Sequence, residues 1–292
     1  MKRVSIGSWS FSLGPFADKP VPWTELLQRL KQLGYEGIEV AGFSIHPRPE
    51  NQPTKADRER IKQEAAEIGI AFPSYIPDLW SERIIDTDDS SGYLRAFRRG
   101  LEFAADIGAT ALCIDTLARP NIFEEIDYET AVKRLANVWK RCAKEAADFG
   151  LYIGWEFEPV YAFNKPSEVV RIVEEVNEDN FGIVFDTCLA EMIGRHGVGQ
   201  FGAKEILRDG CLEYARMLRG KINHGHLMDC DGIVHREGSS NQRFIAEGCL
   251  NIETVMTELN STENCFDWWV IDPGLPHNPW EFAKAGRKYL AR

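Results

Sequence analysis

The sequence predicts an α/β fold, a (β/α)8 TIM barrel formed as a single domain by residues 1–292. Three observations lead to this prediction. Short apolar runs alternate with helix-periodic segments along the chain, with eight of each. Runs such as ALCI and GIVF are almost continuously apolar, which is typical of parallel strands covered on both faces. A glycine repeatedly separates a helical segment from the next apolar run.

The predicted strands are short apolar segments bounded by polar or turn-forming residues. In order they are VSIGSWS (4–10), GIEVAG (37–42), AFPSYI (71–76), ALCID (111–115), YIGWEFE (152–158), FGIVFDT (181–187), INHGHLM (222–228) and WWVID (268–272).

The predicted helices lie between these strands, at 23–33, 54–68, 93–107, 128–149, 166–176, 203–218, 252–259 and 279–289. Gly34, Gly69, Gly108 and Gly150 each follow a helical segment. Glycine adopts the left-handed conformation that ends a helix, so each of these junctions predicts a helix, a glycine and then a strand.

A doubly wound open sheet is the alternative fold. No predicted strand is followed by the G-x-G-x-x-G loop that such a sheet uses to bind a dinucleotide, which favours the barrel. No Pro/Gly/Ser-rich linker or low-complexity segment divides the chain, so we expect one domain.

The composition excludes several classes of protein. A net charge of −11 argues against a nucleic-acid partner, because phosphate binding requires clustered Lys and Arg. No apolar run is long enough to span a membrane, and MKRVSIGSWSF is interpreted as a first strand and not a signal peptide. The seven cysteines show no CxxC spacing, which indicates reduced, mostly buried thiols in a cytoplasmic protein.

The stretch WEFEPV places two carboxylates at the end of a predicted strand. Because side chains alternate along a strand, Glu156 and Glu158 face the same side, and Trp155 and Phe157 face the other. Burying a carboxylate costs free energy unless it is paired, hydrogen-bonded or bound to a metal. The function of this pair therefore depends on what else points toward it.

Polar residues also end three neighbouring strands. In a barrel the functional residues lie at the carboxyl ends of the strands, where Glu158, Asp186, His226 and Asp272 would converge. A single Asp or Glu at a strand end is more often a helix cap or a loop residue than a metal ligand, and Asp186 before Thr187 suits a cap. A lone His is more often a hydrogen-bonded structural residue. The occurrence of these residues on four consecutive strands favours a shared divalent cation: Mn²⁺ first, with Mg²⁺, Co²⁺ and Zn²⁺ as alternatives.

At these positions the sequence resembles the sugar isomerase/epimerase superfamily with the xylose-isomerase-like barrel. That superfamily includes ketose 3-epimerases, hydroxypyruvate isomerases and inosose dehydratases. The matching stretches are Glu158-Pro159, Phe185-Asp186-Thr187, HGHLMD (224–229) and AEGCL (246–250). The resemblance implies one divalent metal held by Glu, Asp and His ligands, with a final Glu from the eighth strand.

Two departures from the family pattern bear on function. Leu189 stands where the family often has a histidine, which argues against the DNA-repair endonuclease branch with its multi-zinc site. Asp272 stands where the family usually has Glu. In the epimerases the carboxylates of the fifth and eighth strands also form the acid/base pair. The shorter Asp272 therefore weakens the expectation of a symmetric two-base epimerisation.

A metal holding a carbonyl and an adjacent hydroxyl acidifies the C–H bond between them by stabilising an enediolate. A nearby carboxylate then removes the proton, and Glu158 is the first candidate for this base. Glu156 is expected to lie behind it as a supporting residue. His224, on the same face as His226, either shuttles a proton or is a hydrogen-bonded core histidine.

The other half of the barrel is expected to bind the sugar. Trp9 could stack on a pyranose ring, and His46 and Asp115 could bind hydroxyl groups, although each also suits a purely structural role. Residues 229–247 form a polar loop of the kind that makes a lid or a partner contact, and Arg236 within it could meet a phosphate.

The sequence therefore favours a metal-dependent isomerase or epimerase acting on a ketose or keto-sugar. The second hypothesis is a lyase that eliminates water or an aglycone from a 3-keto sugar, of the C-glycoside deglycosidase type, which pairs with a small partner subunit. The third, a sugar-binding barrel without activity, does not require a buried carboxylate cluster. A homo-oligomer is expected from the family resemblance.

Overall fold

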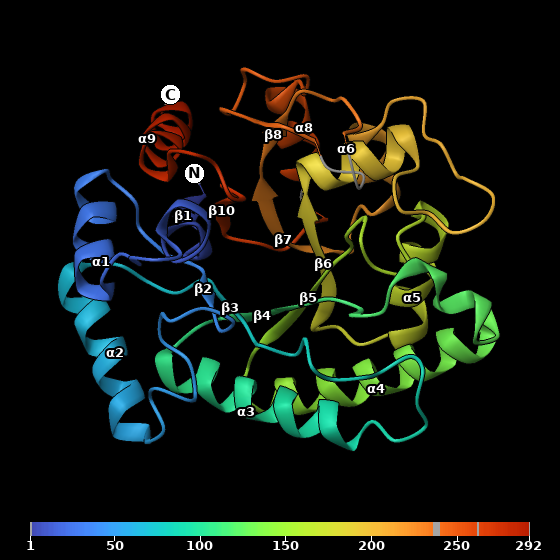
Figure 1. Cartoon of the computed structure of the whole chain (residues 1–292), viewed down its shortest axis with the longest axis horizontal. Helices are drawn as coiled ribbons and strands as arrows, with labels where there is room; N and C mark the ends of the chain where they lie inside the picture. The colour runs from blue at the N-terminus through green and yellow to red at the C-terminus, as the bar shows by residue number, and fades with distance from the viewer. Residues whose placement is uncertain (1, 236–239, 262, 292) are drawn as a thin grey trace.

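The computed structural model describes residues 2–235, 240–261 and 263–291. Its main sheet has eight strands in the order β1-β10-β7-β6-β5-β4-β3-β2, and the paired strands are parallel. The two outer strands also meet, because Gly7 pairs with Glu39 and the Glu39 N–H donates to the Ile6 carbonyl at 2.9 Å. The sheet closes into a barrel with helices outside it (Figure 1), which confirms the predicted TIM barrel.

All eight predicted strands are present, and each is shorter than the apolar run that predicts it. They are β1 (Arg3–Ile6), β2 (Val40–Ala41), β3 (Ser74–Ile76), β4 (Ala111–Ile114), β5 (Tyr152–Glu156), β6 (Phe181–Asp186), β7 (Ile222–Leu227) and β10 (Trp268–Ile271). The predicted loop after β7 contains a small antiparallel hairpin of β8 (Asp229–Cys230) and β9 (Gln242–Arg243).

Seven of the eight predicted helices match closely. They are α1 (Trp23–Gln32), α2 (Lys55–Ile68), α3 (Ser91–Ile107), α4 (Tyr128–Asp148), α5 (Pro166–Val176), α8 (Ile252–Leu259) and α9 (Pro279–Leu290). Short 3-10 turns at Trp9–Phe11 and Gly14–Phe16 lie between β1 and α1, and another at Pro120–Glu124 lies between β4 and α4. The glycines predicted to end helices have positive φ angles: +90° at Gly34, +81° at Gly69, +82° at Gly108 and +70° at Gly150.

One helix was not predicted. The helix α6 (Thr187–His196) begins directly after β6, whereas the predicted helix 203–218 is reduced to α7 (Cys211–Met217). No glycine or proline separates β6 from α6, so the sequence shows no boundary there. The turn is made instead by Asp186, whose side chain accepts a hydrogen bond from the Leu189 N–H at 2.7 Å and caps the helix.

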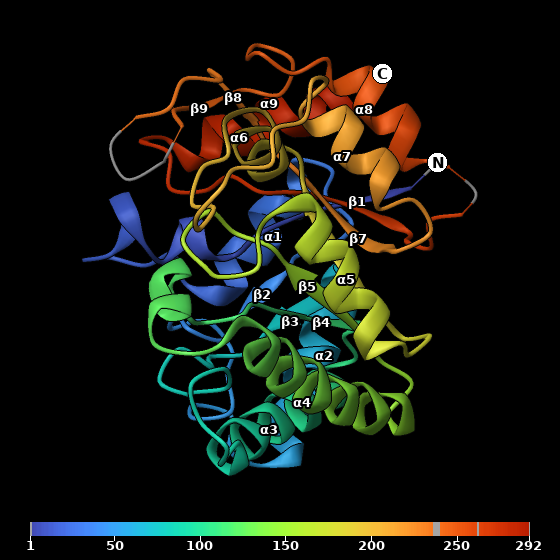
Figure 2. The same ribbon diagram turned by 90° about the vertical axis from the view of Figure 1, so that its right-hand side faces the viewer.

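The packing behind β5 fixes which way its carboxylates point. Trp155 is buried against Trp139 of α4, with 5.2 Å between ring centroids, and Phe157 packs on Tyr214 of α7 at 4.7 Å. α4 lies outside β5 (Figure 2). Since side chains alternate along the chain here, Glu156 and Glu158 face the inside of the barrel.

Within the described part of the chain, no helix combines the length and the apolar character that crossing a bilayer requires.

Candidate metal centre

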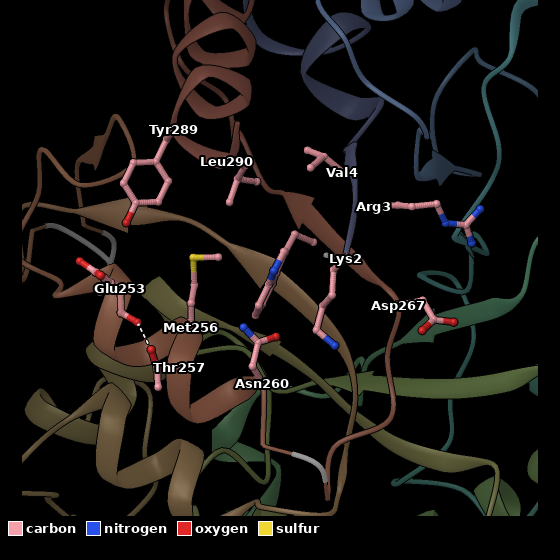
Figure 3. A pocket seen from close by; sticks show the side chains of 11 residues that line it. Lys2, Arg3, Val4, Glu253, Met256, Thr257, Asn260, Asp267, Tyr289 and Leu290 are labelled. Carbon is pink, nitrogen blue, oxygen red and sulfur yellow. Dashed lines mark hydrogen bonds between the residues drawn. The ribbon is translucent and has the colours of Figure 1, made fainter. Parts of the chain in front are cut away.

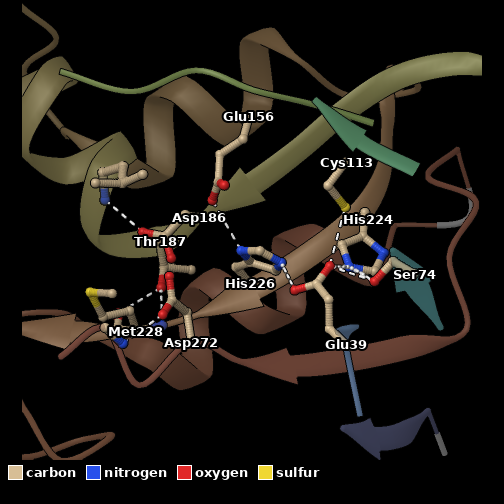
Figure 4. Close-up of polar contacts among 12 residues, drawn as sticks. Glu39, Ser74, Cys113, Glu156, Asp186, Thr187, His224, His226, Met228 and Asp272 are labelled. Atoms are coloured by element: carbon tan, nitrogen blue, oxygen red, sulfur yellow. Dashed lines mark hydrogen bonds and ion pairs between the residues drawn. The ribbon is translucent and has the colours of Figure 1, made fainter. Parts of the chain in front are cut away.

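Four side chains converge at the carboxyl ends of adjacent strands. Glu156 ends β5, Asp186 ends β6, His226 lies near the end of β7, and Asp272 directly follows β10. One oxygen or nitrogen atom from each lies within 4.8 Å of the others (Figure 4). We call this set the carboxylate–histidine group. It brings together three of the four residues that the strand ends predicted.

The fourth member is Glu156, whereas the sequence analysis had placed Glu158 in the group and Glu156 behind it. The difference arises because β5 ends at Glu156, so Glu158 already belongs to the following loop. Glu158 still lies near the group: burial first, then repulsion from Glu156, Asp115 and Asp272, raises its pKa well above the usual range.

The carboxylate–histidine group carries excess negative charge. Burial, and then repulsion from Asp272, raises the pKa of Asp186 well above its usual range, and burial raises the pKa of Asp272 to about 7. The Oδ1 atom of Asp272 accepts a hydrogen bond from the Gly274 N–H at 2.6 Å. The Oδ2 atom of Asp186 is buried and has no hydrogen-bond partner among the described residues.

An unpartnered buried carboxylate oxygen among like charges is unfavourable in the absence of a cation. Three carboxylates and one imidazole nitrogen form a donor set that suits a hard or borderline divalent ion such as Mn²⁺, Mg²⁺ or Zn²⁺. The residues therefore fit a divalent metal, which would lie between Glu156, Asp186, His226 and Asp272.

The imidazole of His226 lies between two carboxylates. Its Nδ1 is 3.0 Å from Glu156 Oε1, and its Nε2 is 2.9 Å from Glu39 Oε2. Burial lowers the pKa of His226, but Glu39 and Glu156 outweigh it and raise the pKa well above its usual value. Metal binding requires an unprotonated Nδ1, and the Nε2–H would then still donate to Glu39.

Glu39 was not identified by the sequence analysis. It is fully buried and accepts hydrogen bonds from Ser74 Oγ, from Cys113 Sγ at 3.1 Å and from His224 Nε2 at 3.1 Å. Burial raises its pKa, but His226 and His224 outweigh this effect and hold the pKa well below its usual range. The signal in the sequence was an acidic residue inside the apolar run GIEVAG, away from the strand end.

Glu39, Cys113, His224 and His226 form a second set of donor atoms within 4.8 Å of one another. Here a single carboxylate lies within ion-pair distance of two imidazoles, 3.1 Å from His224 Nε2 and 2.9 Å from His226 Nε2, so its charge is compensated by these two rings. This second set does not require a cation. Its position on the far side of His226 suits it to orient that ring toward the carboxylate–histidine group.

The other predicted site residues lie in different surroundings. His224, predicted to be catalytic, contacts Glu39 and lies outside the carboxylate–histidine group. Trp9 is buried, packs over Gly7 and lies 6.2 Å from the His226 ring between centroids, so it lines the site. Asp115 accepts a hydrogen bond from the Leu117 N–H at 3.0 Å, and burial raises its pKa to about 7.

His46 is packed in the protein interior. Its Nε2 lies 3.2 Å from the Val21 carbonyl oxygen, and its ring is 5.5 Å from that of Trp23. Burial lowers its pKa. These contacts favour the structural role for His46 over binding of a hydroxyl group. Arg236 lies outside the described residues.

Two hollows lie at opposite ends of the barrel. One of about 870 Å³ lies beside the β10–α9 loop at the carboxyl end, and its lining includes Gln242, Phe244, Leu275 and Asn278. Another, of about 1050 Å³, is lined by residues at the start of β1 and by residues of α8 and the end of α9, among them Arg3, Met256 and Leu290 (Figure 3). The second is at the amino-terminal end, away from the converging strand ends.

The fold and this group together define a TIM barrel with a candidate divalent-metal centre at its carboxyl end. The chain belongs to the family described as xylose isomerase-like TIM barrel, whose model matches residues 27–291. No curated relative matches the chain by sequence.

Several solved structures share the fold. The probable 3-DHS dehydratase AsbF from Bacillus anthracis aligns with a TM-score of 0.72 and 16% identity, covering 100% of this chain and 99% of that one. The IOLI protein with a binding zinc atom aligns at 0.70 and 17%, covering 100% and 97%. The 3-keto-D-glucoside 4-epimerase YcjR from E. coli aligns at 0.68 and 15%, covering 100% and 98%.

Proposed function

We propose that this protein is a divalent-metal-dependent isomerase or epimerase that acts on a ketose or keto-sugar. The observation that carries the proposal is the carboxylate–histidine group, with its excess negative charge and the unpartnered Oδ2 of Asp186. Membership of the xylose isomerase-like family supports the proposal. So do two structural neighbours, one of which binds a zinc atom, whereas the other is a 3-keto-D-glucoside 4-epimerase.

In this proposal Glu156, Asp186, His226 and Asp272 hold the ion, with Mn²⁺ as the first candidate. The oxygen-rich donor set favours Mn²⁺ or Mg²⁺, and Co²⁺ and Zn²⁺ are compatible with the nitrogen donor. When bound, the ion would supply an electrophile that stabilises negative charge on two adjacent oxygens of the sugar.

Glu158 is the proposed base. It lies outside the carboxylate–histidine group but close enough for its charge to interact with Glu156 and Asp272, so its carboxylate is free of the ligand role. It would remove the proton from the carbon between the carbonyl and hydroxyl groups of the sugar, giving an enediolate. Trp9, beside His226, would cover one face of the sugar and exclude water.

A second candidate function is elimination of water or an aglycone from a 3-keto sugar. The Oδ1 atom of Asp272 is held by the Gly274 N–H, so this short carboxylate is poorly placed to act as a second mobile base on the opposite face of the sugar. One-base chemistry favours isomerisation or elimination over symmetric epimerisation, and the likeness to a probable 3-DHS dehydratase supports elimination. A small partner subunit would accompany this function, whereas the isomerase would form a homo-oligomer.

The test measures deuterium exchange from D₂O into a panel of keto-sugars by NMR. Three proteins are compared after dialysis against Mn²⁺: the wild type, Glu156→Gln and Glu158→Gln. We expect about one ion per wild-type chain by mass spectrometry and its loss in Glu156→Gln. Glu158→Gln should retain the ion and lose exchange by roughly 10²-fold or more. The products distinguish isomer, epimer and eliminated fragment.

Two results would contradict the proposal. A wild-type chain that binds no ion after dialysis against Mn²⁺ would remove its basis. Exchange at the wild-type rate in a metal-loaded Glu158→Gln protein would exclude Glu158 as the base.

A further inference from the structure

Three cysteine side chains meet beside the β8–β9 hairpin. Cys230 lies in β8, Cys249 in the segment after β9, and Cys188 in the first turn of α6. The Sγ atoms of Cys230 and Cys249 are 4.0 Å apart, and Cys188 belongs to the same buried cluster as Cys230, where the two thiols influence each other's pKa. The proposed reaction assigns no role to any of these thiols.

The backbone holds Cys230 and Cys249 side by side. The Cys249 N–H donates to the Cys230 carbonyl at 2.8 Å, so the backbones of the two cysteines are direct neighbours. Gly232 leaves space for the Cys249 side chain, because a Cβ at Gly232 would lie only 2.7 Å from Cys249 Sγ. A disulfide requires the sulfur atoms to move from 4.0 Å to about 2.05 Å apart, which is a shift on the scale of side-chain rotation.

The two thiols differ in exposure and in acidity. Cys249 is exposed to solvent, whereas Cys230 is buried behind it. The hydrogen bond with Cys188 lowers the pKa of the Cys230 thiol to about 7, so part of it is thiolate at neutral pH. Burial raises the pKa of the Cys249 thiol to about 12. The Cys230 thiolate is therefore the nucleophile toward a peroxide, and the accessible Cys249 beside it can complete a disulfide.

We propose that Cys230 and Cys249 are a redox modification site, at which a hydroperoxide forms a reversible disulfide. The Cys230 thiolate attacks hydrogen peroxide, the O–O bond breaks, and a sulfenic acid and hydroxide form. The Cys249 thiol then attacks the Cys230 sulfur, the S–S bond forms, the S–O bond breaks and hydroxide leaves, and the protons released by the two thiols convert both hydroxides to water. Two thiols and one peroxide yield one disulfide and two waters.

The bond would close residues 230–249 into a covalent ring. This segment contains the β8–β9 hairpin, and Gln242 of that hairpin packs on Gly274, whose N–H holds Asp272. The disulfide would therefore tie down the hairpin next to the loop that positions Asp272. The site needs neither metal nor sugar, so its test is independent of the proposed function.

The test treats the purified full chain with hydrogen peroxide and then maps its peptides without reduction. We expect the intact mass to fall by about 2 Da, the seven titratable thiols to fall by two, and dithiothreitol to reverse both changes. Cys249→Ser should abolish the linked peptide. Cys265→Ser is the matched control because Cys265 is also exposed, and it should leave the linkage unchanged.

Three outcomes would overturn the proposal. They are a Cys188–Cys230 linkage in place of Cys230–Cys249, stable sulfinic acid at Cys249 with Cys230 still free, and an unchanged linked peptide in Cys249→Ser. Circular dichroism of each variant confirms that the fold is retained.

Discussion

His226 shows how one side chain couples two parts of this barrel. Its Nδ1 faces the carboxylate–histidine group through Glu156, and its Nε2 faces Glu39. A buried carboxylate that accepts the Nε2–H fixes the tautomer and the ring orientation, and it makes Nδ1 a better donor to a metal. Glu39 is therefore a positioning residue that acts through His226.

Replacing Glu39 by Gln should weaken divalent-metal binding by roughly 10–100-fold. The substitution keeps the shape of the side chain but removes the charge that faces His226 and His224. Titration calorimetry with Mn²⁺ measures the effect. Glu36→Gln is the matched control, since Glu36 lies on the same segment and is exposed. Unchanged affinity in a folded Glu39→Gln protein would exclude the positioning role.

At the level of elements, one buried carboxylate in β8 fastens the segment that follows the β8–β9 hairpin. Asp229 accepts hydrogen bonds from four backbone N–H groups, those of Cys230, Ala246, Gly248 and Leu250, at 2.9 to 3.2 Å. These contacts give the stretches HGHLMD and AEGCL a structural role. Asp229, the last residue of HGHLMD, accepts hydrogen bonds from the backbone of AEGCL and holds that segment in place.

Asp229→Asn should destabilise the protein by roughly 2–3 kcal/mol, because the amide NH₂ would face N–H donors and leave some of them unpaired. Urea denaturation measures the change in the free energy of unfolding. Glu247→Gln, on the same segment but exposed, should change it by less than about 0.5 kcal/mol. Equal effects of the two substitutions would show that Asp229 does not fasten the hairpin.

On the scale of the whole molecule, the barrel gathers negative charge at its carboxyl end. The chain has a net charge of −11, and Asp115, Glu158, Asp186 and Asp272 there all have raised pKa values. The closed sheet is the cause, since it forces the ends of parallel strands toward one axis. Folding without a cation therefore works against charge repulsion, and a bound cation would relieve it.

The metal-free protein should lose stability as the pH rises from about 4 to 7. In the folded state the pKa values of Asp115 and Asp272 are about 7, whereas their ordinary value is 3.8. The folded state therefore binds more protons than the unfolded state in this interval, and raising the pH favours unfolding. Thermal unfolding after chelation should show a midpoint lower at pH 7 than at pH 5 by on the order of 5 °C.

Divalent metal should reverse this loss. At a hundredfold excess over its dissociation constant, the ion adds about 2.7 kcal/mol to the free energy of unfolding at pH 7. Asp115→Asn removes one titrating group near the site and should flatten the pH dependence of the metal-free protein. A midpoint that is independent of pH and of Mn²⁺ would contradict the charge argument.

The sequence alone determined the alternation of strands and helices, and it identified the strand ends Asp186, His226 and Asp272. These features are local: apolar runs, helical periodicity and left-handed glycines are set by neighbouring residues. The sequence analysis noted that Asp186 suits a cap but predicted no helix after it, since no glycine or proline separates β6 from α6. The sequence could not decide whether Glu156 or Glu158 joins the group, since that depends on where β5 ends.

Only the tertiary structure placed Glu39 beside His224 and His226. Glu39 and His224 are 185 residues apart in the chain and 3.1 Å apart in space. Closure of the barrel brings the segment before β2 across from β7, and no local pattern encodes that contact. The charge on Glu39 is tolerated in the core because two imidazoles from a distant strand compensate it, so its role became visible only in the folded chain.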